Sequence, residues 1–257
     1  MDTIRKTLVL ARLAIEENIR KKILYILLFV SVIMIAFSSS MTSFNLGAQV
    51  TIMKDICLSG IGLFGIVFTL SLFLNVIPKE IETKTIYPFL AQPVTRGTYL
   101  TGKFLGIFIL IAANMLFLGL ELMVVLKMYE PIWNFGVLQV VALNILQCGV
   151  LGAIMLLFSL ISSYPLALTI TIFLYIVGGI SSPYIAYISG SIPAPVIKSL
   201  LAIKLILPKF DIFNIKDAVV HDHTLLPGYF LAAIIYGIAY ILIIQLFSIM
   251  IFEKKDL

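Results

Sequence analysis

Long apolar runs constrain this chain more than any other feature of its sequence. Hydrocarbon has no hydrogen-bonding partner for backbone N–H and C=O groups, so a segment crosses a membrane either as a helix or in a closed β-barrel. Barrel strands alternate apolar and polar residues, whereas the apolar runs here are uninterrupted. Of the residues, 61% are hydrophobic and only 12% are charged, while soluble domains carry roughly 25% charged residues. We therefore predict an all-α integral membrane protein.

A transmembrane helix needs about 20 apolar residues to cross a hydrocarbon layer about 30 Å thick. By this criterion the whole chain, residues 1–257, is expected to form a single transmembrane domain with about six spans. A cytoplasmic loop is expected at 78–103 and a long outer loop at 189–228. The predicted spans are 23–41, 56–77, 104–126, 137–161, 166–188 and 229–252.

The segment before the first span, residues 2–22, has the pattern of an amphipathic helix. Apolar residues recur every three to four positions, and charged residues such as Arg5 and Glu16 face elsewhere. A helix of this kind lies along the membrane interface, so lipids are an expected partner. The predicted apolar stripe consists of Ile4, Leu8, Ala11, Ile15 and Ile19.

Lys and Arg residues predict the orientation, because cytoplasmic loops of membrane proteins are enriched in them. An even number of spans places both termini on one side, which we expect to be the cytoplasmic side of a bacterial or archaeal inner membrane. The net charge of +5 is then explained by lipid headgroups, and nucleic acid is not an expected partner. The side predicted to be cytoplasmic holds Arg5, Lys6, Arg12, Arg20, Lys21, Lys22, Lys79, Lys84, Arg96, Lys103, Lys254 and Lys255.

The predicted cytoplasmic loop is too polar for lipid and rich in residues that break helices. Glu80 and Glu82 stand near its beginning, where acidic side chains favour the N-terminus of a helix. Pro93 stops regular structure, and either Thr95 or Thr98 is expected to cap the helix that follows. We predict a short, structured element on the membrane face.

The loop runs Glu80-x-Glu82-x-x-Thr85, then Pro93-Val-Thr-Arg96, then Gly102-Lys103. This pattern resembles the first cytoplasmic loop of type-two ABC exporter permeases. Residues 14–25 are similar to that family's interfacial helix. Residues 207–217 resemble the loop before the last span in the subgroup that includes the permease for nitrous oxide reductase maturation. The resemblance extends over essentially the whole chain.

The resemblance implies a transmembrane permease subunit that forms the pathway for an unknown substrate and pairs with a second copy or a similar chain. Two cytoplasmic ATPase subunits, which bind ATP and magnesium, would drive it. This chain itself would bind no cofactor or metal and would not be an enzyme. The same loop residues also fit a solvated face beside two spans. The implied ATPase-coupling interface consists of Glu80, Glu82, Thr85, Pro93, Arg96 and Lys103.

Residues 97–104 come close to the phosphate-binding pattern G-x-x-x-x-G-K-[ST], which is typical of ATPases. The last position holds Phe104, however, whereas the pattern needs a Ser or Thr hydroxyl for magnesium. The strand of a soluble sheet that should precede the pattern is not expected in a chain of this composition. We therefore expect ATP to bind a partner chain rather than this one.

Four polar side chains within the predicted spans are candidates for a pathway or a subunit interface. Ionisable residues inside a membrane are functional hypotheses by default, and Glu121 is the carboxylate placed well inside a span. It lies about 27 Å along a helix from Lys103, so a boundary residue that reaches the headgroups is the other interpretation. Asn144 and Gln147 share one helix face and favour interhelical hydrogen bonds. The candidates are Asn114, Glu121, Asn144 and Gln147.

Two other functions compete with the exporter permease. An ion-coupled secondary transporter needs charged pairs and broken helices near mid-membrane, and only Glu121 and the pair Gly178-Gly179 point that way. A non-transporting assembly or anchoring factor would bind a soluble partner through the same loop. The sequence His221-Asp222-His223 could bind a metal, but zinc takes three or four ligands and the two cysteines lie elsewhere, so a solvated outer loop is the better interpretation. An intramembrane enzyme would need a histidine at membrane depth.

Overall fold

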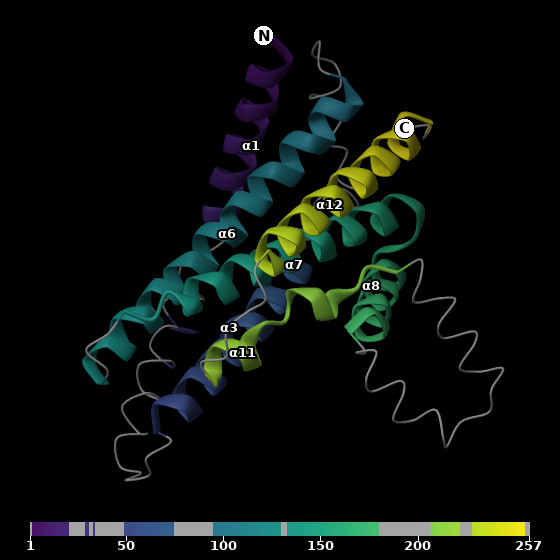
Figure 1. Cartoon of the computed structure of the whole chain (residues 1–257). Coiled ribbons are helices and arrows are strands. Elements are labelled where there is room, and N and C mark those ends of the chain that lie inside the picture. The colour runs from purple at the N-terminus through teal and green to yellow at the C-terminus, as the bar shows by residue number, and fades with distance from the viewer. Residues whose placement is uncertain are drawn as a thin grey trace, which may run out of the picture.

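The structure is a computed structural model, and it describes residues 2–20, 29–30, 33, 49–74, 95–129, 133–179, 207–221 and 228–254. Within these ranges the secondary structure is helical and contains no strand, which confirms the predicted all-α class (Figure 1). Among the described helices, the four that are long and apolar enough to cross a membrane are α3 (Gln49–Leu74), α6 (Arg96–Tyr129), α7 (Gly136–Ile161) and α12 (Tyr229–Lys254).

The predicted spans agree with these helices to different degrees. α7 and α12 begin within a residue of their predicted starts, whereas α3 begins at Gln49 rather than at residue 56. α8 (Tyr164–Gly179) covers the first part of the predicted span 166–188 and, with 16 residues, is shorter than a crossing needs. The predicted span 23–41 lies almost wholly outside the described residues. The count of six spans therefore stays a prediction.

Helix α6 begins at Arg96, inside the segment 78–103 that was expected to be a loop. Thr95 is the residue that caps it, because its Oγ1 accepts the backbone N–H of Thr98 at 3.2 Å. With 34 residues, α6 is about 51 Å long and exceeds a hydrocarbon layer of about 30 Å. A polar first turn is therefore compatible with a membrane helix, and the residues 97–104 that approach the phosphate-binding pattern are helical.

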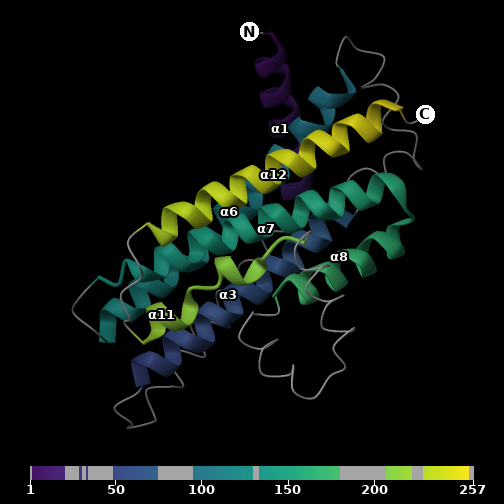
Figure 2. The ribbon, with the colours of Figure 1, turned by 45° about the vertical axis from the view of Figure 1, so that its right-hand side comes forward.

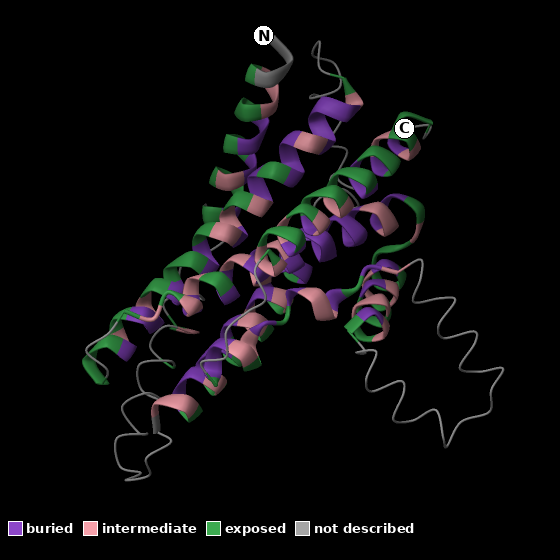
Figure 3. Ribbon diagram, in the orientation of Figure 1, coloured by how far each residue is buried: buried purple, intermediate pink, exposed green. Residues whose placement is uncertain are grey.

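Helix α7 lies at the centre of the bundle and is buried along most of its length (Figure 3). It packs against α3, α6, α8 and α12. Its apolar residues surround the whole helix rather than one stripe, which is the pattern of a helix with neighbours on every side. On one side Cys148 Sγ lies 3.8 Å from Met115 Sδ of α6, and Cys148 is a free thiol that packs as a small apolar group.

The N-terminal helix α1 (Asp2–Arg20) lies against the first half of α6 (Figures 1 and 2). Two glycines of α6, Gly102 and Gly106, face it. A Cβ at Gly106 would lie 2.8 Å from Ala14 Cβ and nearer still to the carbonyl oxygen of Ala11. The spacing G-x-x-x-G is a known way for two helices to pack backbone against backbone. This close contact joins α1 firmly to α6.

The face of α1 that packs on α6 differs from the predicted stripe. Ala11 belongs to both, but Leu8 of the predicted stripe is 60% exposed. Small side chains fit against glycines where larger ones would not, so the packing face consists of Leu10, Ala11, Ala14 and Asn18. Leu8, Val9 and Leu13 form a second, exposed apolar face. The predicted position of α1 along the membrane interface stays a prediction.

Both described ends of the chain lie at the same end of the bundle. Figure 1 shows the N-terminus of α1, the start of α6 and the C-terminal end of α12 together. That both termini lie on the cytoplasmic side of a membrane stays a prediction.

Candidate functional site

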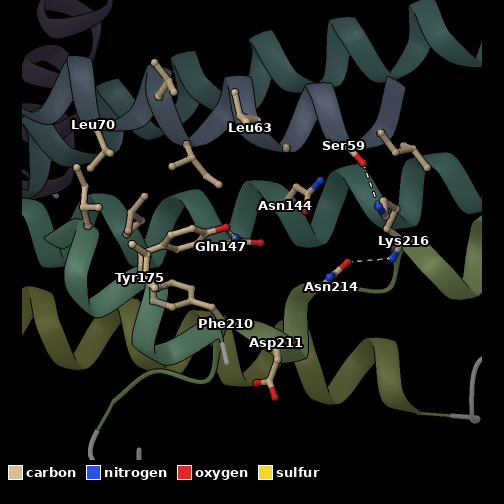
Figure 4. A pocket seen from close by; sticks show the side chains of 18 of the residues that line it. Ser59, Leu63, Leu70, Asn144, Gln147, Tyr175, Phe210, Asp211, Asn214 and Lys216 are labelled. Atoms are coloured by element: carbon tan, nitrogen blue, oxygen red, sulfur yellow. Dashed lines mark hydrogen bonds between the residues drawn. The ribbon is translucent and has the colours of Figure 1, made fainter. Parts of the chain in front are cut away.

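A cavity of about 900 Å³ lies between α3, α7, α8 and a segment that contains η1 (Phe210–Phe213) and α11 (Lys216–Val220), as Figure 4 shows. Its volume falls within the roughly 300–1,000 Å³ of pockets that hold drug-sized ligands. Along α3 it extends from Leu58 to Leu70, which is about 18 Å. Its apolar walls consist of Leu63, Ile66, Val67, Leu70, Leu151, Ile172 and Ile176.

Helix α12 holds the segment with η1 and α11 in place. Tyr229 of α12 donates its hydroxyl to the carbonyl oxygen of Ile212 at 2.9 Å. Tyr236, about two turns further along α12, accepts the backbone N–H of Lys209 at 2.9 Å. Phe213 is fully buried, and the centre of its ring lies 6.0 Å from that of Tyr236. The segment runs beside α3, α7 and α8 (Figure 2) and forms the fourth wall of the cavity.

One end of the cavity is charged. Lys216 Nζ lies 2.7 Å from Asp55 Oδ1 of α3 and donates to Ser59 Oγ at 3.0 Å. Asp217 Oδ1 lies 3.9 Å from the same ammonium group. These bonds tie α11 to the beginning of α3. Of the residues that line the cavity, the charged ones all come from this segment, as Asp211, Lys216 and Asp217.

Two amide side chains of α7 line the middle of the cavity. Gln147 is only 9% exposed, and its Nε2 donates to the hydroxyl of Tyr175 on α8 at 3.1 Å. This is the interhelical hydrogen bond that the sequence predicts for Gln147. Asn144, one turn earlier, faces the cavity without a hydrogen bond to the other residues drawn in Figure 4. Gln147 lies about 16 Å along α7 from its first residue, which is close to the middle of a membrane span.

Asn114 and Glu121, the other two predicted polar residues, do not reach the cavity. Both are on α6, and no residue of α6 lines the cavity. Within the described part of the chain, neither the Oδ1 of Asn114 nor the carboxylate oxygens of Glu121 have a hydrogen-bond partner. The structure therefore divides the four candidates into two pairs, and only the pair on α7 shares a site.

The predicted coupling residues divide in a different way. Glu80, Glu82, Thr85 and Pro93 lie outside the described residues. The guanidinium of Arg96 donates from Nη1 to two backbone carbonyls in the last turn of α12, at 3.2 and 3.3 Å. These carbonyls have no partner within their own helix, and a cation at this end also suits the helix dipole.

Lys103 lies about two turns further along α6 and points to α1 instead. It is only 5% exposed, and its Nζ lies 3.1 Å from Glu17 Oε2. The same ammonium group is 5.9 Å from the centre of the Tyr99 ring. Arg96 and Lys103 therefore join the start of α6 to α12 and to α1. Together with the contact at Gly102 and Gly106 we call these the α6 clamp.

Sequence reasoning missed Asp55, Ser59, Tyr175 and Lys216 of the site. Asp55 and Lys216 are separated by most of the chain, and only the fold shows that they pair. Asp55 and Ser59 do share one helix face by their spacing, which is a usable signal for a polar site. Tyr175 stands in an apolar run, where its hydroxyl needs a partner, but the sequence does not indicate which one.

Comparison of the sequence with models of protein families and with curated proteins finds no match. The likeness to exporter permeases therefore depends on the quoted segments alone. As for metals, the described residues contain no group of three or more His, Cys, Asp or Glu side chains that could hold an ion. Asp222 and His223 lie outside the described residues.

Proposed function

We propose that this chain is the transmembrane permease subunit of an ATP-driven exporter. It works with separate cytoplasmic ABC ATPase subunits and pairs with a second copy or a similar chain in a bacterial or archaeal cytoplasmic membrane. The observation that carries this proposal is the α6 clamp, which begins at Arg96 in the last part of the predicted coupling loop. In this function the loop receives force, and the clamp passes it to the spans.

A motor can drive transport only if its ATP-bound and ATP-free states contact the membrane part differently. The displacement then has to pass through a stiff element to the helices that line the pathway. Arg96 attaches the start of α6 to α12, while Lys103 and the glycine contact attach it to α1. A push on residues 78–94 would therefore move three helices together. The cavity beside α3, α7 and α8 is large enough for a drug-sized cargo.

The test is to purify the tagged protein gently from its native membrane and to identify the proteins that accompany it. We expect an ATPase chain. Reversing both charges in the variant Glu80→Lys/Glu82→Lys should release that chain while leaving membrane insertion intact. The control is Glu16→Lys, which reverses an exposed charge of α1 outside the α6 clamp.

The possible outcomes also separate the competing functions. Retention of the ATPase by the loop variant would contradict the coupling assignment. If no ATPase accompanies the chain and vesicles containing it move substrate only along an ion gradient, the chain is a secondary transporter. If a soluble partner binds through the loop and no ATP-dependent movement occurs, it is an anchoring factor.

A further inference from the structure

Polar groups in the cavity follow a definite order from one end to the other. Lys216 and Asp217 lie at the mouth, where Lys216 pairs with Asp55. The uncharged amides of Asn144 and Gln147 lie at mid-depth. Among the lining residues that the structure describes, those around the inner end at Leu70 are apolar. A ligand that fits this order has a polar head, an uncharged hydrogen-bonding group and an apolar tail.

The amide side chains at mid-depth determine which chemical group of a ligand fits beside them. An unpaired charge at this depth is costly. Lys216 and Asp217 lie at the mouth, and Figure 4 shows the carboxylate of Asp211 directed away from Asn144 and Gln147. An asparagine side chain offers both a donor and an acceptor. The amide of Asn144 has no hydrogen bond to the other lining residues drawn in Figure 4, so both functions are available to a ligand. A ligand amide, which also donates and accepts, satisfies both.

The cavity is also open on its side. Leu63 and Val67 of α3 and Ile176 of α8 line the cavity and are exposed at the surface of the described part of the chain. These three side chains are apolar and stand on spanning or apolar helices, where the surrounding medium is lipid. A tail can therefore enter from the bilayer without crossing water.

We propose that this cavity binds a single-chain amphiphile whose alkyl tail is joined to its polar head through an amide. The amide pairs with Asn144, the tail occupies the apolar inner end, and the head lies at the charged mouth. That this amphiphile is the cargo rests on the proposed exporter function. The binding itself does not need an ATPase, so the binding proposal and the exporter proposal can fail separately.

The experiment measures binding of tritiated N-dodecanoyl ethanolamine to the full chain, with any subunits that accompany it, in nanodiscs by scintillation proximity. We expect saturable binding that is displaced by the unlabelled amide. Ethylene glycol monododecyl ether has the same tail and hydroxyl head but lacks the amide, and it should bind about two- to tenfold more weakly. Equal binding of the amide and the ether would overturn the proposal.

Two variants with matched controls locate the site. Asn144→Leu should weaken binding of the amide by about two- to tenfold and leave binding of the ether unchanged. Its control is Gln245→Leu, which removes a buried amide of α12 that does not line the cavity. If Asn144→Leu and Gln245→Leu weaken binding of the amide equally, or if neither weakens it, Asn144 does not bind the ligand amide and the proposal is wrong.

A steric pair on α3 gives an independent measurement. Gly62 lines the cavity and faces Asn144, whose Nδ2 would lie 3.5 Å from an added Cβ. Gly62→Leu should therefore fill the space and reduce binding of both the amide and the ether by about tenfold or more. Gly60→Leu is the control, because a Cβ there meets no described atom within 4 Å. Undiminished binding to a folded Gly62→Leu variant would place the ligand elsewhere.

Discussion

Alanine at Gly106 tests the contact between α1 and α6 most directly. A Cβ at this position would lie 2.8 Å from Ala14 Cβ and nearer still to the carbonyl oxygen of Ala11. The second of these atoms belongs to the backbone and cannot rotate away, so α1 as a whole must shift. Overpacking of this kind costs about 1–3 kcal/mol. Replacing Gly by Ala inside a helix stabilises it by about 1 kcal/mol through propensity alone.

Gly60→Ala separates these two effects, because a Cβ there meets no described atom within 4 Å. Gly106→Ala should therefore have a free energy of unfolding about 1–3 kcal/mol lower than that of Gly60→Ala. Reversible unfolding in mixed detergent and dodecyl sulfate measures this difference. Spin labels on exposed positions of α1 and α6 should also move apart in Gly106→Ala alone. Equal stability of the two variants would refute the close backbone contact.

Three further variants test other contacts. Arg96→Met should raise amide hydrogen exchange in the last turn of α12 severalfold, because two carbonyls lose a charge-assisted hydrogen bond worth about 1.5–3 kcal/mol when shielded from water; unchanged exchange would contradict the α6 clamp. Lys216→Met should cost less than about 1 kcal/mol, since the side chains of its pair with Asp55 are 25% and 47% exposed, yet it should broaden the distance distribution between labels on α11 and α3. High salt should broaden the same distance distribution in the unmodified protein. Gly178→Leu should make the segment around η1 sensitive to protease, because a Cβ there would lie 2.9 Å from a Phe210 ring carbon, whereas Gly179→Leu, with open space around it, should not.

The sequence was sufficient to predict the helical class and the position of the most apolar helices. α7 and α12 begin where hydropathy predicts because each is apolar over nearly its whole length. The predicted span 104–126 lies inside α6, and Thr95 was one of the two residues expected to cap this helix. The sequence nevertheless assigns the polar segment from Thr95 to Lys103 to the loop. Its polar groups are satisfied by α1 and α12, which lie far away in the sequence. Tertiary partners of this kind cannot be identified from one segment.

The cavity shows the same limit more clearly. Asn144 and Gln147 were recognised as a pair because helical spacing puts them on one face. Nothing in the sequence indicates that Lys216 and Tyr175 come to the same place. Asn114 and Glu121 satisfied the same polar criterion and yet lie on a helix that does not border the cavity. Periodicity predicts which residues share a face, whereas the neighbour of that face depends on how the helices pack.

Helix α3 belongs to both parts of the molecule that the proposed exporter requires. Its residues from Leu58 to Leu70 form one wall of the cavity, and Leu74 is its last residue before the predicted coupling loop. At the other end of that loop, α6 is held at its start by α1 and α12. A displaced loop would therefore pull α3 relative to α7 and would move α1, α6 and α12 together as one body. The inner end of the cavity at Leu70 is nearest to the loop, whereas Lys216 ties the mouth to α3. In such a transporter the cavity would widen at its inner end first, before the mouth at Lys216 is released.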